Sequence, residues 1–106
     1  MVLTQIAELH VDDVGTEIRL TLLDDDAPVD LTGASELTIL LRKPSGTVVS
    51  KTASVVGEAT NGVIHCYTAA EDLDEAGLYE IQARIVLGSW SGHSDIRRVR
   101  VYANVE

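Results

Sequence analysis

The chain has 106 residues, 45% of them hydrophobic and 24% charged, which is the size and composition of one folded globular domain. Its formal net charge of −9 argues against a nucleic-acid-binding protein, because such proteins draw their affinity from basic residues that neutralise phosphates. Its apolar runs are short triplets, far below the roughly 20 residues of a membrane span, and the first five residues lack the features of a secretory signal. We therefore expect a soluble acidic domain that binds neither nucleic acid nor membranes.

Strands dominate the expected secondary structure, because apolar residues recur with a period of two and no long window shows a helical period. Residues 16–22 give the clearest strand, and an acidic turn at 24–28 follows it. Residues 36–42 alternate again and connect through a tight turn at 43–46 to residues 47–49. This arrangement predicts a hairpin.

The pattern of short strands continues beyond this hairpin. Small residues predict only a short strand near 53–56, and the turn at 61–62 leads into a β-rich segment at 63–68. Residues 69–75 are mostly acidic with one apolar anchor, which favours a single helical turn with acids near its start. Residues 78–87 then alternate over the longest apolar face of the chain, so we expect a central strand there.

The C-terminal part adds a hairpin loop at 88–92 and a last strand at 96–102, where the apolar alternation slips and predicts a bulge near Arg97 and Arg98. About seven short strands separated by turn residues are typical of an all-β, immunoglobulin-like antiparallel sandwich of two sheets. We assign residues 14–106 to this sandwich, with one short helical turn, and residues 1–13 to an N-terminal segment.

Tyr79 has two interpretations. It follows Gly77 at the start of the longest strand, where a tyrosine corner would place its hydroxyl within reach of the backbone of the preceding connection. Tyr79 could equally be an ordinary aromatic residue of the core.

Three stretches in a characteristic order carry a family resemblance. They are APVDLTGA (27–34), LRKPSGTVV (41–49) and TNGVIHCYTAAEDLDEAGLYEIQARI (60–85). Together with the alternating strand before them, they resemble the immunoglobulin-like N-terminal domain of the baseplate upper proteins of tailed bacteriophages, and related small virion modules, over roughly residues 14–88. The resemblance implies a structural protein of the virion, made in the cytoplasm of the host bacterium, whose partners are other virion proteins and copies of itself.

The expected function is therefore non-enzymatic assembly in the tail, baseplate or neck of a phage particle. The alternative is a capsid decoration protein or a carbohydrate-binding surface module. Sugar-binding platforms generally use several exposed aromatic side chains, and this chain has 4% aromatic residues and no Phe. Its composition thus favours the assembly role.

The residue pattern predicts no catalytic, cofactor or metal site. The acids at 24–30 do not follow a calcium-binding loop, and the three histidines, His10, His65 and His93, are too scattered to pair on a metal by sequence. The single cysteine, Cys66, has no basic neighbour and shares an apolar face with Ile64, so we expect a buried, inert thiol.

The N-terminal residues are the first candidate interface. Leu3, Ile6 and Leu9 have a spacing that fits neither a clean strand nor a long helix. One interpretation is an arm that pairs with the exposed strand edge of a neighbouring subunit. The other is a strand that completes a sheet of its own domain.

Three further candidate interface residues lie near the C-terminus. Trp90 is flanked by Ser and Gly, so it either forms an exposed anchor or folds back over the open end of the sandwich. Arg97 and Arg98 lie in residues 84–106, which hold four arginines and two acids, whereas residues 1–36 hold nine acids and one base. This asymmetry either reflects ordinary solvated charge or steers copies and partners together.

Overall fold

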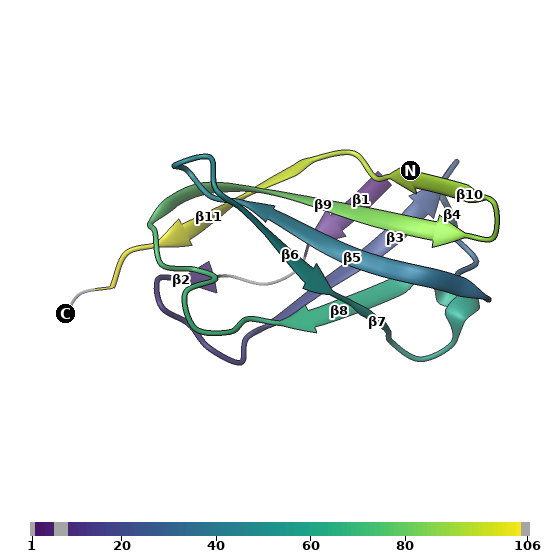
Figure 1. The fold of residues 1–106 in the computed structure, drawn as a ribbon, viewed down its shortest axis with the longest axis horizontal. Helices are drawn as coiled ribbons and strands as arrows, with labels where there is room; N and C mark the ends of the chain where they lie inside the picture. Colours follow the sequence, from purple (N-terminus) through teal and green to yellow (C-terminus); the bar gives the residue numbers. More distant parts are fainter. Residues whose placement is uncertain (1, 6–8, 105–106) are drawn as a thin grey trace.

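The computed structural model describes residues 2–5 and 9–104, and their strands form two sheets that pack against each other (Figure 1). Sheet A has the strand order β1-β3-β8-β7, with β4 paired to β3. Its strands are β1 (Val2–Gln5), β3 (Glu17–Asp24), β4 (Ala27–Pro28), β7 (Ser54–Val55) and β8 (Val63–Tyr67). Sheet B has the order β2-β11-β9-β5-β6, with β10 paired to β9. Its strands are β2 (Leu9–His10), β5 (Ala34–Arg42), β6 (Val48–Thr52), β9 (Gly77–Leu87), β10 (Trp90–His93) and β11 (Arg97–Tyr102).

The strand order is that of an immunoglobulin-like domain. The order β1-β3-β8-β7 corresponds to strands A, B, E and D, and β6-β5-β9-β11 corresponds to C′, C, F and G. Among the described pairs, β2 with β11 is parallel, and the others are antiparallel. The predicted all-β, two-sheet sandwich of immunoglobulin type is confirmed.

The core lies between the two sheets. It is built from the alternate side chains of each strand that point toward the opposite sheet. On β9, Tyr79, Ile81, Ala83 and Ile85 are completely buried. This strand pairs with β5 on one side and with β10 and β11 on the other, so the prediction of a central strand at 78–87 is confirmed.

Tyr79 forms a tyrosine corner, the first of the two interpretations that the sequence left open. Its hydroxyl donates a hydrogen bond to the Glu75 carbonyl oxygen at 2.9 Å and accepts one from the Glu75 N–H at 3.1 Å. Burial raises the pKa of this phenol. The side chain therefore belongs to the core and also fixes the connection that precedes β9.

The acidic turn after β3 reverses the chain as predicted. Asp25 and Asp26 both have positive φ, 51° and 65°, between the paired strands β3 and β4. Two consecutive residues of positive φ are typical of a type I′ hairpin, and Asp is among the residues that tolerate this conformation.

The helical turn predicted at 69–75 is wrong. The one helical turn of the described residues is a 3₁₀ helix, η1, at Ala59–Asn61. Glu71 has a φ of 74°, which interrupts a right-handed helix. The Asp72 carboxylate accepts a hydrogen bond from the Ala69 N–H at 2.7 Å and closes a local turn instead.

The acids of this connection bind the hairpin formed by β5 and β6. Asp72 forms an ion pair of 2.7 Å with Lys51 of β6, and Asp74 forms one of 2.7 Å with Lys43, which directly follows β5. The Lys43 ammonium also donates to the Glu71 carbonyl at 2.8 Å. These acids therefore hold the β8–β9 connection against the hairpin and do not begin a helix.

The bulge predicted near Arg97 and Arg98 lies just before them. Both arginines pair in regular register with β9, opposite Ile81 and Glu80. Between the last pair of β10 and the first of β11, β9 advances three residues and the facing strand advances four, so the extra residue lies within 94–96.

The N-terminal residues contribute to both sheets of their own chain. The β1 backbone pairs with β3, with Leu3 opposite Leu22, and β2 pairs with β11. Leu9 is completely buried in the core, so in this structure its side chain is not open to a neighbour. Ile6 lies outside the described residues. An exchange of this segment between subunits stays a prediction.

Deleting residues 2–9 should destabilise the isolated monomer. The deletion removes the β1 ladder and the buried Leu9, and truncating a buried Leu to Ala alone costs about 2–5 kcal/mol. A thermal melt followed by circular dichroism measures the loss, and deletion of residues 2–5 alone separates β1 from Leu9. A melting temperature unchanged by the longer deletion, together with loss of incorporation into particles, would show that the segment acts as an arm.

Candidate interaction surfaces

Apolar side chains gather on the outer face of sheet B. Because β9 and β11 turn Tyr79 and Val101 into the core, their alternate residues point outward. Four large hydrophobic side chains on this face are 42–54% exposed: Val48, Leu78, Ile96 and Tyr102. Exposed apolar side chains that share one face are typical of a protein interaction surface.

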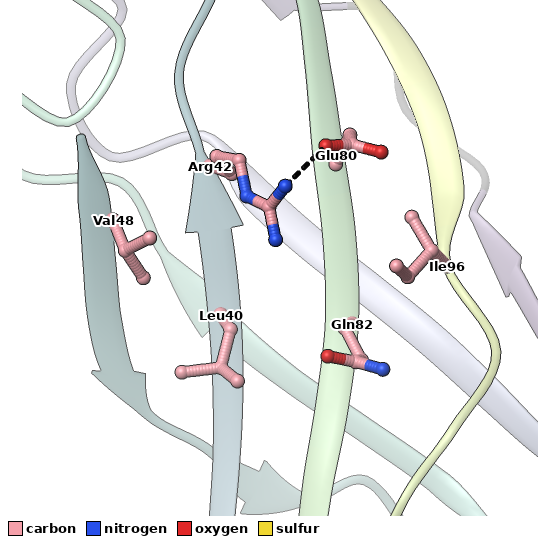
Figure 2. A pocket seen from close by; sticks show the side chains of 6 residues that line it. All are labelled: Leu40, Arg42, Val48, Glu80, Gln82 and Ile96. Carbon is pink, nitrogen blue, oxygen red and sulfur yellow. Dashed lines mark ion pairs between the residues drawn. The ribbon is translucent and has the colours of Figure 1, made fainter. Parts of the chain in front are cut away.

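A shallow hollow lies within this face (Figure 2). Leu40 and Val48 form its apolar wall on one side, and Ile96 lies on the other side beyond β9. Arg42 of β5 is paired opposite Glu80 of β9, and their side chains form an ion pair of 3.1 Å. The hollow thus has apolar walls and a charged border.

The outer face of sheet B is basic although the chain is acidic. Arg98 also reaches Glu80, at 3.4 Å, so one carboxylate serves two guanidinium groups. A second ion pair joins Arg84 and Glu36 at 2.7 Å. With Arg100 added, the face carries four arginines and two glutamates, while the chain has a net charge of −9. Arginine and exposed apolar side chains together are enriched at protein interfaces.

Trp90 lies at the opposite end of β9, beside the β3–β4 turn. It is 49% exposed and lines a second hollow together with Asp24, Val29, Leu87 and His93. Its ring covers Gly92 on the same strand, where an added Cβ would come within 2.6 Å of a ring carbon. Trp90 therefore folds over its own strand and keeps half of its surface open.

The structure separates the predicted interface residues. Leu3 and Leu9 lie in different sheets, Trp90 lies at one end, and Arg98 lies within the basic outer face of sheet B. Arg97 is exposed on β11 opposite Ile81. Their role in binding a neighbour stays a prediction.

Sheet A carries a charged cluster that was not predicted from the sequence. The Glu17 carboxylate lies 2.7 Å from Nδ1 of His65 and 2.9 Å from Arg19. The hydrogen bonds from His65 and Arg19 lower the pKa of Glu17. This contact therefore stabilises the fold above the ordinary pKa of a glutamate and is lost as the pH falls through the lowered value. Alternation already places Glu17 and Arg19 on one face of β3, but only the register of β3 with β8 brings His65 to them, so the sequence carries no direct signal for the complete cluster.

Cys66 is buried as predicted, and burial raises the pKa of its thiol to about 11. Since the thiolate is the reactive form, we expect Cys66 to remain unmodified by a disulfide reagent at pH 8 and to react fully once denaturant unfolds the chain. Labelling followed by mass spectrometry measures both rates. Rapid modification of the folded domain would contradict the buried placement.

Removing metal ions should leave the melting temperature unchanged. In the described part of the chain, no cluster of three or more His, Cys, Asp or Glu side chains has the arrangement of a metal site. The Asp30 carboxylate instead accepts hydrogen bonds from the N–H and hydroxyl of Thr32, at 2.9 and 2.6 Å. A melt with and without EDTA tests this expectation, and a drop that Ca²⁺ reverses would establish a site in the acidic turn.

Solved structures of other proteins share the fold. CopC from Methylosinus trichosporium OB3b is 12% identical with a TM-score of 0.60, and the match covers 99% of this chain and 96% of that chain. An endo-β-1,4-mannanase from Thermotoga petrophila is 9% identical with a TM-score of 0.56, and the match covers 97% of this chain but 20% of that chain. At these identities the similarity shows the fold alone.

Comparison of sequences identifies the family. No curated protein matches the chain. Within residues 2–5 and 9–104, no helix has the length and apolar character that crossing a bilayer demands. The family model of the BppU N-terminal domain matches residues 2–103, and the chain therefore belongs to this family of N-terminal domains of phage baseplate upper proteins, which are structural domains of the baseplate.

Proposed function

We propose that this domain is a non-enzymatic assembly module of the virion, which binds neighbouring subunits and copies of itself. The observation that carries the proposal is the outer face of sheet B, where Leu40, Val48 and Ile96 form an apolar hollow bordered by arginines. Family membership makes virion proteins the natural partners. The particle would assemble from chains made in the host cytoplasm.

The use of the reactive side chains also supports a non-enzymatic role. Cys66 is buried with a raised pKa, which disfavours a nucleophile. Asp72 and Asp74 are engaged with Lys51 and Lys43 in holding a connection in place. These side chains therefore contribute to the stability of the sandwich.

A carbohydrate-binding module is the second candidate, because Trp90, Asp24 and His93 line one hollow. An aromatic face beside polar groups can bind a sugar ring. Tryptophan fluorescence during titration with cell-wall polysaccharide from the host tests this role. A saturable change in the fluorescence of Trp90 would favour it over pure assembly.

Incorporation into particles tests the assembly role. We expect Ile96→Asp to remain folded, since Ile96 is 42% exposed, and to be depleted from purified particles because it places a charge in the hollow. Val14→Asp is the matched control, because Val14 is 65% exposed and does not line the hollow. Equal incorporation of both variants would show that the outer face of sheet B does not bind a neighbouring subunit.

A further inference from the structure

Two surfaces of this domain are complementary in charge. The basic face is defined by Leu40, Val48 and Ile96 with Arg42 and Arg98 at the border. The acidic end is defined by the exposed turn residues Asp24, Asp25 and Asp26 together with the half-exposed Trp90. Each surface has an exposed apolar centre, and the surrounding charge is net positive on the basic face, where Arg42 and Arg98 share Glu80, and negative at the acidic end.

We propose that the acidic end of one copy docks on the basic face of a second copy, so that Trp90 occupies the hollow and Asp25 and Asp26 approach Arg42 and Arg98. The inference deepens the proposed function, on which it rests, by naming both contacting surfaces. A half-exposed tryptophan is a typical anchor of such contacts, and exposed apolar walls are what its ring would cover.

The charges of the basic face favour this occupant. Arg42 and Arg98 are 54% and 68% exposed, and both depend on the single carboxylate of Glu80. One carboxylate cannot neutralise two guanidinium groups, so a positive charge remains for a partner. The rest of the chain is strongly acidic, so a second copy supplies the needed carboxylates.

The same charges disfavour a symmetric pair of basic faces. Two copies placed face to face would bring arginines of like charge together, which opposes association. A head-to-tail contact uses two different surfaces and leaves one of each kind free at the ends of the assembly. Such a contact can repeat and can close into a ring or continue as a filament.

Sedimentation velocity of the purified domain tests the proposal with two complementary variants. The face variant carries Arg42→Glu and Arg98→Glu, and the end variant carries Asp25→Asn, Asp26→Asn and Trp90→Ala. Asn tolerates the positive φ of Asp25 and Asp26, so these two changes keep the backbone of the turn. The control variant, Asp12→Asn with Glu71→Asn, neutralises two exposed acids of positive φ at the opposite end of the sandwich.

We expect the unmodified domain and the control to form species larger than dimers, with association weakened about tenfold when salt rises from about 50 to 500 mM. Each complementary variant alone should be monomeric. Their equimolar mixture should form a dimer that does not grow, because only one intact contact remains. An unmodified domain that stays monomeric, or a mixture that stays monomeric while the unmodified domain associates, would overturn the proposal. Depletion of Ile96→Asp from particles would still support the proposed function in that case.

Discussion

Replacing Ile81 with Asp is expected to unfold the domain. Ile81 is completely buried at the centre of β9, between Leu41 of β5 and Arg97 of β11. A carboxylate there loses its hydration among the apolar side chains of the core, and the cost, about 4–5 kcal/mol or more, is comparable to the whole stability of a small domain. Circular dichroism should show no cooperative thermal transition for this variant.

Leu78→Asp is the matched control on the same strand. Leu78 is 50% exposed on the outer face of sheet B, so the new carboxylate stays in water. Its effect should be about 0.5 kcal/mol or less. A domain that tolerates Asp equally at both positions would contradict the inward orientation of Ile81.

Gly62→Ala is expected to cost about 2–4 kcal/mol through two separate effects. Gly62 ends the 3₁₀ helix with a φ of 70°, which an alanine adopts only with strain. An added Cβ would lie 2.8 Å from the Leu22 carbonyl oxygen and 2.9 Å from the Val29 nitrogen, on either side of the hydrogen bond that joins them. Both neighbours are backbone atoms, so relief requires sheet A itself to shift.

Gly33→Ala separates the strain from the clash. Gly33 has a similar φ of 77°, but an added Cβ there would meet no atom within 4 Å. The Gly33→Ala variant should therefore lose only the stability that the strained φ costs, about 1–2 kcal/mol. Urea denaturation of both variants measures the difference, and equal losses would mean that the tight contact around Gly62 is absent.

The long strands were predictable because each carries its own pattern, whereas the hairpin loop predicted at 88–92 is wrong for Trp90–Gly92, which belong to strand β10. Residues 16–22 alternate strictly and residues 78–87 alternate over most of their length, and β3 and β9 occupy these stretches with one face buried. The place of Tyr79 beside a turn raised the tyrosine corner as one of two interpretations, and the hydrogen bonds of its hydroxyl to Glu75 decide for it. The helical turn at 69–75 was mispredicted because its acids form long-range ion pairs with Lys43 and Lys51, which no local pattern contains.

The candidate surface was harder to predict from the sequence than the strands were. Alternation indicates that Leu40 and Arg98 point outward, but it does not say which strands are neighbours. Arg42, Glu80 and Arg98 meet only because β5 and β11 flank β9. For Trp90 the sequence left an exposed anchor and a folded-back ring as alternatives, and in the structure the ring covers Gly92 and stays half exposed. Long-range strand pairing thus decides where the surface lies.

Imaging of labelled particles tests the central claim that this is a structural domain of the phage baseplate. Antibodies raised against the domain would be bound to purified virions and located by negative-stain electron microscopy. We expect label at the tip of the tail, at several positions around the tail axis on each particle. Label confined to the capsid, or virions without label beside a protein that remains free in the lysate, would contradict the claim.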